Sequence, residues 1–92
     1  MQSLANVFKV LSSEQRLKII EHLLEVGEYK CYCELGSVLE KDLSVIYRHF
    51  KKLENVNLIE TRKRGKRLEG RVKEPEKVEK LMKIMEEIKN ED

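Results

Sequence analysis

The sequence has no apolar run that approaches the ~18 residues of a membrane span, and no basic segment followed by an apolar stretch that resembles a signal peptide. We therefore expect a soluble cytoplasmic protein with no membrane partner. Internal repeats and low-complexity segments are also absent. Because 92 residues are too few to support two separate cores, we expect residues 1–92 to fold as a single domain.

The residue patterns of common enzyme mechanisms are missing as well. The chain shows no pair of carboxylates suited to acid–base catalysis, no combination of Ser, His and Asp, and no phosphate-binding loop. The sequence therefore predicts a protein that is not an enzyme and requires no cofactor.

The charge is small in total but uneven along the chain. The formal net charge is +2, yet residues 41–73 hold eleven basic and four acidic side chains, while residues 1–40 and 74–92 are each net acidic. Phosphate binding requires a local basic surface rather than a basic protein. The middle segment is therefore the candidate for nucleic-acid binding, although such a charge run is often only a solvated face.

Apolar residues at helical spacing predict four helices in the first part of the chain. The first has its apolar stripe within residues 4–11, and the second begins at a capping-box pattern formed by Ser12 and Gln15. A short third helix precedes Asp42, which is a favourable N-cap for the fourth. The inward face of the fourth helix is expected to consist of Leu43, Ile46, Phe50 and Leu53.

The pattern then changes to that of a β-hairpin followed by one more helix. Residues 58–63 and 67–73 can form two strands around a turn at Gly65, and the second of them alternates apolar and charged side chains. Pro75 suits the first position of the last helix. The sequence therefore predicts a mainly α fold with one small hairpin.

The third and fourth helices, joined at Glu40 and Lys41, have the layout of a helix-turn-helix, whose second helix lies in the major groove of DNA. The outward side chains of this second helix could bind base edges or phosphate, and Arg48 could bind guanine. These side chains are Ser44, Val45, Tyr47, Arg48, Lys51 and Lys52.

The hairpin that follows this helix is strongly basic. A basic hairpin beside a recognition helix is typical of a wing that reaches the DNA backbone or a minor groove. The alternative is a charged hairpin whose side chains only keep it soluble. The predicted fold class is thus a winged helix-turn-helix, with wing contacts from Arg62, Lys63, Arg64, Lys66 and Arg67.

Three parts of the sequence together resemble the ArsR/SmtB family. The opening of that family is similar to residues 8–12 with 16–20, its Cys-x-Cys metal box to residues 31–35, and its recognition helix to residues 46–53. The resemblance runs from about residue 4 to residue 72. It implies a dimeric repressor of the metal- and redox-responsive kind, which occupies an operator and leaves it when an inducer binds. Three places depart from the family pattern. Glu14 stands where the family often has proline. Glu40 and Lys41 replace a usual glycine and apolar pair in the turn.

Cys31 and Cys33, the only two cysteines, are the candidate metal site. The third departure from the family pattern concerns the ligands available at this site. Thiolates bind soft ions such as As(III), Zn(II), Cd(II) and Cu(I), but Gly36 stands where arsenic sensors tend to have a third cysteine. We expect His22 on a solvated helix face and His49 on the DNA-binding helix, so that neither completes the site. The cysteines could instead sense oxidants by forming a disulfide, or be structural.

The first and last helices, residues 1–11 and 75–90, are the expected dimer interface. Each carries an apolar stripe that so small a domain can hardly cover, although both stripes could instead pack on one internal core. A two-fold dimer would set two recognition helices ~34–36 Å apart, as a palindromic operator requires. The interface residues are expected to be Leu4, Val7, Phe8, Leu11, Val78, Leu81, Met82, Met85 and Ile88.

The sequence thus predicts a regulator that binds specific double-stranded DNA, a homodimeric repressor released by a thiol-reactive metal, metalloid or oxidant. Three alternatives are a DNA-binding regulator that senses no ligand, a winged helix that binds only proteins, and a thiol–metal carrier. The outward cations of the fourth helix and the wing argue against protein binding alone. A carrier would need exposed cysteines and no affinity for DNA.

Overall fold

The predicted order of four helices, a hairpin and a last helix is present in the computed structural model, which describes residues 3–89. Residues 1, 2 and 90, which were expected to belong to the terminal helices, lie outside the described residues. The elements are α1 (Leu4–Leu11), α2 (Glu14–Val26), β1 (Lys30–Cys31), the 3₁₀ helix η1 (Tyr32–Glu34), α3 (Leu35–Leu39), α4 (Leu43–Asn55), β2 (Ile59–Arg64), β3 (Arg67–Val72) and α5 (Pro75–Lys89).

The boundary between α1 and α2 uses two serines in different roles. Ser13 caps α2, since its hydroxyl oxygen accepts a hydrogen bond from the backbone N–H of Arg16 at 3.3 Å. Ser12 instead closes α1 and donates its hydroxyl to the carbonyl of Lys9 at 2.6 Å. The predicted cap at Ser12 was therefore wrong by one residue, because either serine satisfies the rule for an N-cap.

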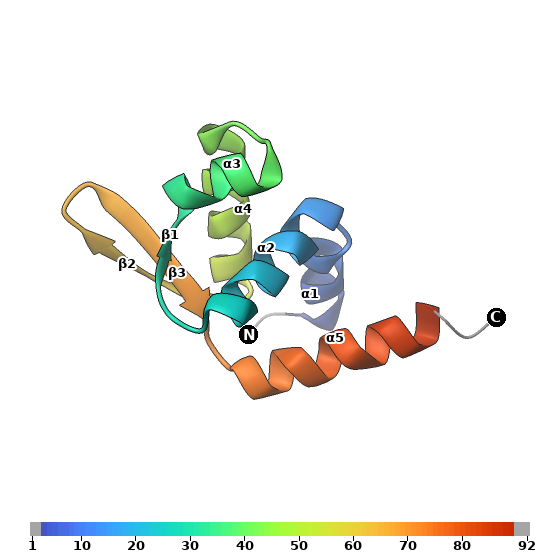
Figure 1. Cartoon of the computed structure of the whole chain (residues 1–92). Helices are drawn as coiled ribbons and strands as arrows, with labels where there is room; N and C mark the ends of the chain where they lie inside the picture. The colour runs from blue at the N-terminus through green and yellow to red at the C-terminus, as the bar shows by residue number, and fades with distance from the viewer. Residues whose placement is uncertain (1–2, 90–92) are drawn as a thin grey trace.

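The sheet has three antiparallel strands in the order β1–β3–β2, one more than the hairpin predicted. Figure 1 shows β2 and β3 extending from the helical body as a long hairpin. The added strand β1 pairs Lys30 with Gly70 and Cys31 with Glu69. Two residues are too few to show a strand periodicity in the sequence. Through β1, the cysteine segment is hydrogen-bonded to the hairpin.

The core lies where α2 and α4 meet the inner face of the sheet. Its members come from every helix between α2 and α5 and from both hairpin strands: Ile19, Ile20, Leu23, Leu35, Ile46, Phe50, Leu53, Ile59, Leu68, Val72 and Val78. The predicted inward face of α4 is confirmed at three positions and wrong at Leu43, which is 43% exposed. Leu43 begins α4 and packs beside Gly36 of α3 instead of entering the core.

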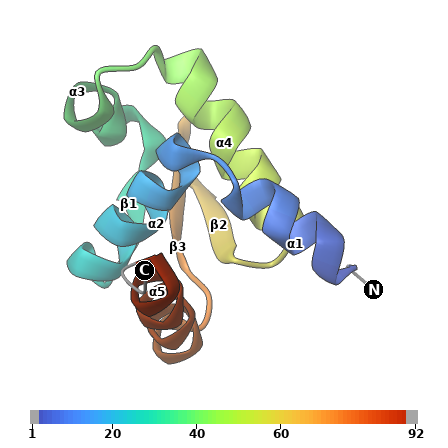
Figure 2. The ribbon, with the colours of Figure 1, turned by 90° about the vertical axis from the view of Figure 1, so that its right-hand side faces the viewer.

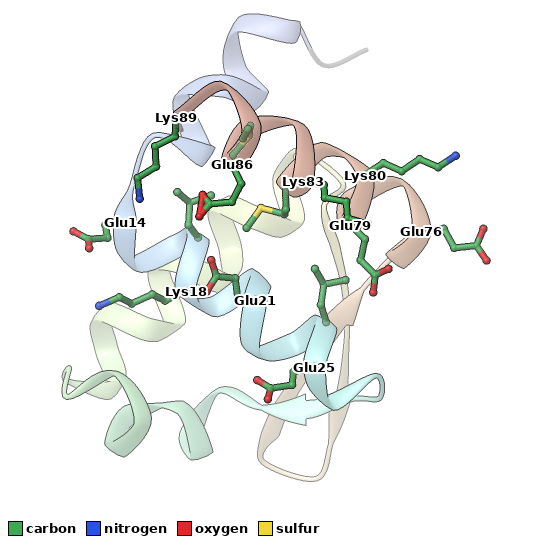
Figure 3. A pocket seen from close by; sticks show the side chains of 14 residues that line it. Glu14, Lys18, Glu21, Glu25, Glu76, Glu79, Lys80, Lys83, Glu86 and Lys89 are labelled. Carbon is green, nitrogen blue, oxygen red and sulfur yellow. The ribbon is translucent and has the colours of Figure 1, made fainter. Parts of the chain in front are cut away.

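The last helix covers the body only with its first half. Val78 is the only residue of α5 that is buried, and a groove of about 1040 Å³ runs between α2 and the rest of α5. Figure 3 shows glutamates and lysines of both helices around this groove, whose lining also includes Leu17, Leu24, Met82 and Met85. Among residues 3–89, no helix is long and apolar enough for a membrane span.

Gly70 provides a test of how tightly α4 packs on the sheet. A Cβ atom at Gly70 would lie 2.9 Å from Phe50 Cε2 and 3.3 Å from Ile59 Cδ1, and both of these side chains are fully buried. We predict that Gly70→Ala lowers the free energy of unfolding by about 1–3 kcal/mol, measured by urea denaturation. Gly36→Ala is the control, because its close contact is the end of the half-exposed Leu43 side chain, which can rotate away. Equal losses in the two variants would contradict the packing argument.

Candidate nucleic-acid interface

The helix α4 presents one buried and one exposed face. Its buried residues Ile46, Phe50 and Leu53 follow the helical period, so the opposite side of the helix is left to solvent. Asp42 occupies the N-cap as predicted, but its side chain makes no capping hydrogen bond. Of the outward residues predicted to contact DNA, Val45 is half-buried and the others are exposed: Ser44, Tyr47, Arg48, Lys51 and Lys52.

The turn between α3 and α4 is closed by Glu40, whose φ of 55° and ψ of 43° are left-handed. The next backbone N–H, that of Lys41, donates to the carbonyl of Gly36 at 3.1 Å. Glycine is the residue that adopts this conformation without strain. The turn therefore keeps the geometry that glycine favours, although a glutamate fills the position.

Some of the cations that face outward form ion pairs with carboxylates, and others do not. On α4, Lys51 lies 3.3 Å from Glu54, whereas Arg48 and Lys52 have no carboxylate within 4.0 Å among residues 3–89. Hydrogen bonds, first from the Thr61 hydroxyl and then from Lys51, lower the pKa of Glu54 although desolvation raises it. Lys51 is thus partly neutralised, and the free charge of the helix rests on two residues.

The wing shows the same division between its base and its turn. Arg62 Nε donates to Glu69 Oε1 at 2.8 Å, and Arg67 lies 3.3 Å from Glu34. By contrast, the cations at or beside the turn have no carboxylate partner among residues 3–89 and are fully free to bind anions: Lys63, Arg64 and Lys66. Gly65, with a φ of 62°, makes this turn.

The base of the wing is held by an aromatic and ionic cluster that the sequence analysis missed. The ring of Tyr29 has the guanidinium of Arg62 at 4.0 Å and that of Arg71 at 4.4 Å. Arg71 lies 2.6 Å from Glu60 Oε1, which also accepts the Tyr29 hydroxyl at 3.3 Å. The hydrogen bond from Arg71 is the main cause that lowers the pKa of Glu60. Opposite charges at cross-strand positions, Glu60 with Arg71 and Arg62 with Glu69, were the available signal.

Tyr47 of α4 is also engaged within the chain. Its ring meets the edge of Tyr32 with centroids 5.4 Å apart, and Lys51 Nζ lies 5.9 Å from the Tyr47 ring centroid. Tyr32 is in turn 6.3 Å from the ring of Phe50. Tyr47 is consequently only 37% exposed, the least among the exposed large apolar and aromatic residues.

Neither histidine is placed to ligate a metal with the cysteines. His49 lies on α4, as expected, where its Nδ1 is 3.2 Å from Arg16. Burial lowers the pKa of His49, and the charges of Arg16, Lys52, Arg48 and Lys41 lower it further. His22 was expected on a solvated face, but it is half-buried and its Nε2 is enclosed without a hydrogen-bond partner. Within residues 3–89, no three His, Cys, Asp or Glu side chains form a metal site.

Cys31 and Cys33 are joined as a disulfide, with Cα atoms 5.1 Å apart. Cys31 is 1% exposed and begins η1, and its sulfur accepts the backbone N–H of Cys33 at 3.2 Å. Cys33 is exposed. The pair therefore joins one residue that is buried in the core to one that lies at the surface.

The apolar residues predicted for the dimer interface fall into three groups. Leu4, Phe8 and Ile88 are more than half exposed. Four other residues of the predicted interface are half-buried: Val7, Leu81, Met82 and Met85. Leu11 and Val78 are 5% and 7% exposed, so they belong to the interior of this chain and not to a surface. Ile84, which was not predicted, is 53% exposed.

Comparison with known proteins finds one family and many relatives. Residues 13–61 match the sequence profile of the family described as "Bacterial regulatory protein, arsR family". The cadmium resistance transcriptional regulatory protein CadC of Listeria innocua is 30% identical over 64 residues, which are 70% of this chain and 53% of that protein. The arsenical resistance operon repressor of Escherichia coli is 40% identical over 60 residues, which are 65% and 50% of the two chains. The chain thus spans about half the length of these relatives.

A solved structure from Mycobacterium bovis, described as a homodimeric winged helix-turn-helix DNA-binding domain, matches with a TM-score of 0.79. It shares 23% sequence identity, and the match covers 96% of this chain and 79% of that one. This likeness shows that the fold is a winged helix-turn-helix, as predicted from the sequence.

Proposed function

The chain belongs to the arsR family of bacterial regulatory proteins, whose fold is that of DNA-binding transcriptional regulators and not of enzymes, and on that premise we propose that it represses transcription as a homodimer on a specific operator. Here α4 reads bases in the major groove and the β2–β3 turn binds the backbone beside it. The helix α4 contacts β2, and Figure 1 shows the hairpin extending to one side of α4. A palindromic operator is expected because a homodimer presents two such surfaces.

One observation carries this proposal. Five cations on α4 and at the wing turn have no carboxylate within 4.0 Å among residues 3–89: Arg48, Lys52, Lys63, Arg64 and Lys66. The neighbouring cations Lys51, Arg62 and Arg67 are each paired with a glutamate. Unpaired cations gathered on one surface are what counterion release from DNA requires. A winged helix that binds only proteins would not need them.

The position of each cation suggests its role. Arg48 and Ser44 lie in the first half of α4, where side chains reach base edges, and Arg48 can bind guanine through two hydrogen bonds. Lys52 lies one turn further along and is assigned to phosphate. Lys63 and Arg64 of the wing are assigned to phosphate as well. We also propose DNA contacts from Val45, Tyr47, Lys51, Arg62 and Arg67. The last four of these side chains are released from their intramolecular partners when DNA binds.

We predict that Arg48→Ala reduces the preference for operator over random DNA by about 1–3 kcal/mol. Lys63→Ala and Arg64→Ala should weaken binding to both DNAs and each lower the slope of log K against log salt by about 1. The measurement is fluorescence anisotropy with the promoter of the protein's own gene and with a random duplex, over a salt series. Lys80→Ala on α5 removes the same charge outside this surface and should change neither quantity. An equal loss on both DNAs for Arg48→Ala would contradict its assignment to a base.

The dimer interface is proposed on the exposed apolar side chains of the terminal helices. Leu4 and Phe8 of α1 and Ile84 and Ile88 of α5 are each more than half exposed. Figures 1 and 2 show α1 and the end of α5 on the side of the molecule away from the wing turn, so that pairing there leaves both reading surfaces free. The homodimeric description of the M. bovis domain supports a second copy as the partner.

Phe8→Glu should convert the dimer to a monomer, because pairing would bury the new carboxylate without a partner. Sedimentation velocity measures the change, and circular dichroism checks that the variant is folded. Val38→Glu is the control, since Val38 is similarly exposed but lies on α3. A Phe8→Glu dimer as stable as the wild-type dimer would exclude α1 from the interface.

The inducer is proposed to act on Cys31 and Cys33. With a peroxide as oxidant, the exposed Cys33 thiolate attacks one peroxide oxygen, the O–O bond breaks, and water or an alcohol leaves. The Cys31 thiol then attacks the sulfenic sulfur, which forms the disulfide and releases one water. A soft ion such as Cd(II) or As(III) would instead bind the two thiolates and require further ligands from a free thiol or the second subunit. The names of the cadmium and arsenical resistance relatives support such inducers.

The combined variant Cys31→Ser and Cys33→Ser should bind the operator as the reduced wild type does, but should no longer be released by Cd(II), As(III) or peroxide. Gel-shift titrations of both proteins with each agent provide the test. If the wild type stays bound in the presence of all three agents, the cysteines are structural and the chain regulates without sensing a thiol ligand.

A further inference from the structure

We propose that Tyr32 and Glu34 are positioning residues, which carry the closure of the Cys31–Cys33 pair to the DNA-binding surface by holding Tyr47 and Arg67 away from DNA. The inference rests on the proposed thiol sensing and adds the route by which it reaches the operator. It assigns roles to two residues that are not themselves expected to touch DNA.

The route begins at η1, the single turn that contains Tyr32, Cys33 and Glu34. Cys31 precedes this turn and is fixed at its own end, because it is buried and pairs with Glu69 of β3. Closing a bond from the fixed Cys31 sulfur to Cys33 therefore determines where the exposed end of η1 lies. Tyr32 stands between the two cysteines and Glu34 follows them directly, so both side chains are positioned by the same closure.

The first arm of the route ends on the recognition helix. The ring of Tyr32 meets Tyr47 with centroids 5.4 Å apart and rests on the buried Phe50 at 6.3 Å. Because Phe50 is fully buried, its ring cannot move aside and it holds the Tyr32 ring in place. Tyr47 packs against this fixed Tyr32 ring. In the closed state Tyr47 is thereby held against η1 and withheld from base edges.

The second arm ends on the wing. Glu34 lies 3.3 Å from Arg67, at the start of β3, and 3.5 Å from Lys30. Arg67 stands opposite Arg64 in the hairpin register. Closure of the Cys31–Cys33 pair thus neutralises Arg67, which is one of two adjacent cations that would otherwise bind phosphate.

The same geometry accounts for inducers of different chemistry. A disulfide and a metal bound by both thiolates each draw the two sulfurs together around Tyr32. When the sulfurs separate, η1 is released at its Cys33 end, and Tyr47 and Arg67 become free to bind DNA. The dithiol form is therefore the form with high DNA affinity, and either kind of closure lowers it.

The test compares the Kd for the operator between the disulfide and dithiol forms, with the thiol state checked by alkylation and mass spectrometry. In the wild type we expect the disulfide form to bind more weakly, by a factor within the roughly 5–150-fold range of coupled sites. Glu34→Gln and Tyr32→Ala should each lower this ratio of Kd values, and the double variant should bring it to unity. Tyr32→Phe keeps the ring and should retain the wild-type ratio.

Glu28→Gln is the matched control for charge. Glu28 is exposed in the loop before β1 and pairs with no cation among residues 3–89, so its loss should change the Kd of both forms equally and leave the ratio unchanged. Because Tyr32 touches the core, thermal unfolding accompanies Tyr32→Ala. Tyr47→Ala tests the same contact from the exposed side and should also lower the ratio.

The failures of the two proposals can be told apart. If neither form of the wild type binds DNA, the proposed function is wrong and this inference falls with it. If both forms bind equally, DNA regulation stands but there is no thiol effect to transmit. If the wild-type ratio persists in the double variant, thiol sensing stands and the route through Tyr32 and Glu34 is wrong.

Discussion

The packing of the Phe50 ring fixes the functional elements of this protein relative to one another. The ring comes from α4, lies so close to Gly70 of β3 that a Cβ atom there would clash, and supports Tyr32 of η1. Recognition helix, wing and cysteine segment thus meet at one fully buried side chain. Because protein interiors are close-packed and transmit strain, a displacement of one of the three elements affects the packing of the other two. The proposed regulation depends on that property.

The ion pairs divide the hairpin into a paired base and an unpaired turn. The base of the wing is a closed network of Tyr29, Glu60, Arg62, Glu69 and Arg71, in which opposite charges face one another across strands. At the turn, by contrast, Arg64 faces Arg67, and like charges in this position destabilise a hairpin. A phosphate between them would remove the repulsion. The charges of the wing are therefore paired where it joins the body, and the cations at its turn are left without carboxylate partners among residues 3–89.

The sequence predicted the features that depend on residue spacing. The order of helices, the hairpin and the exposed face of α4 followed from apolar periods, and they fixed most of the candidate DNA contacts. Features that depend on three-dimensional neighbours were missed. The strand β1 is too short to have a period, the Tyr29 cluster requires the strand register, and Leu11 and Val78 have the same apolar spacing as interface residues although they are buried. Glu34, the carboxylate partner of Arg67, is distant from it in the sequence and was missed for the same reason.

The proposed DNA-binding surface consists of α4 and the wing turn. Its most direct test is NMR titration of the reduced protein with operator DNA, read at the backbone amides. We predict that the largest shifts occur at Arg48, Lys52 and the turn residues 63–66, and that the α2–α5 groove around Met85 is unaffected. The largest shifts at the α2–α5 groove, with Arg48 and the turn unchanged, would contradict it.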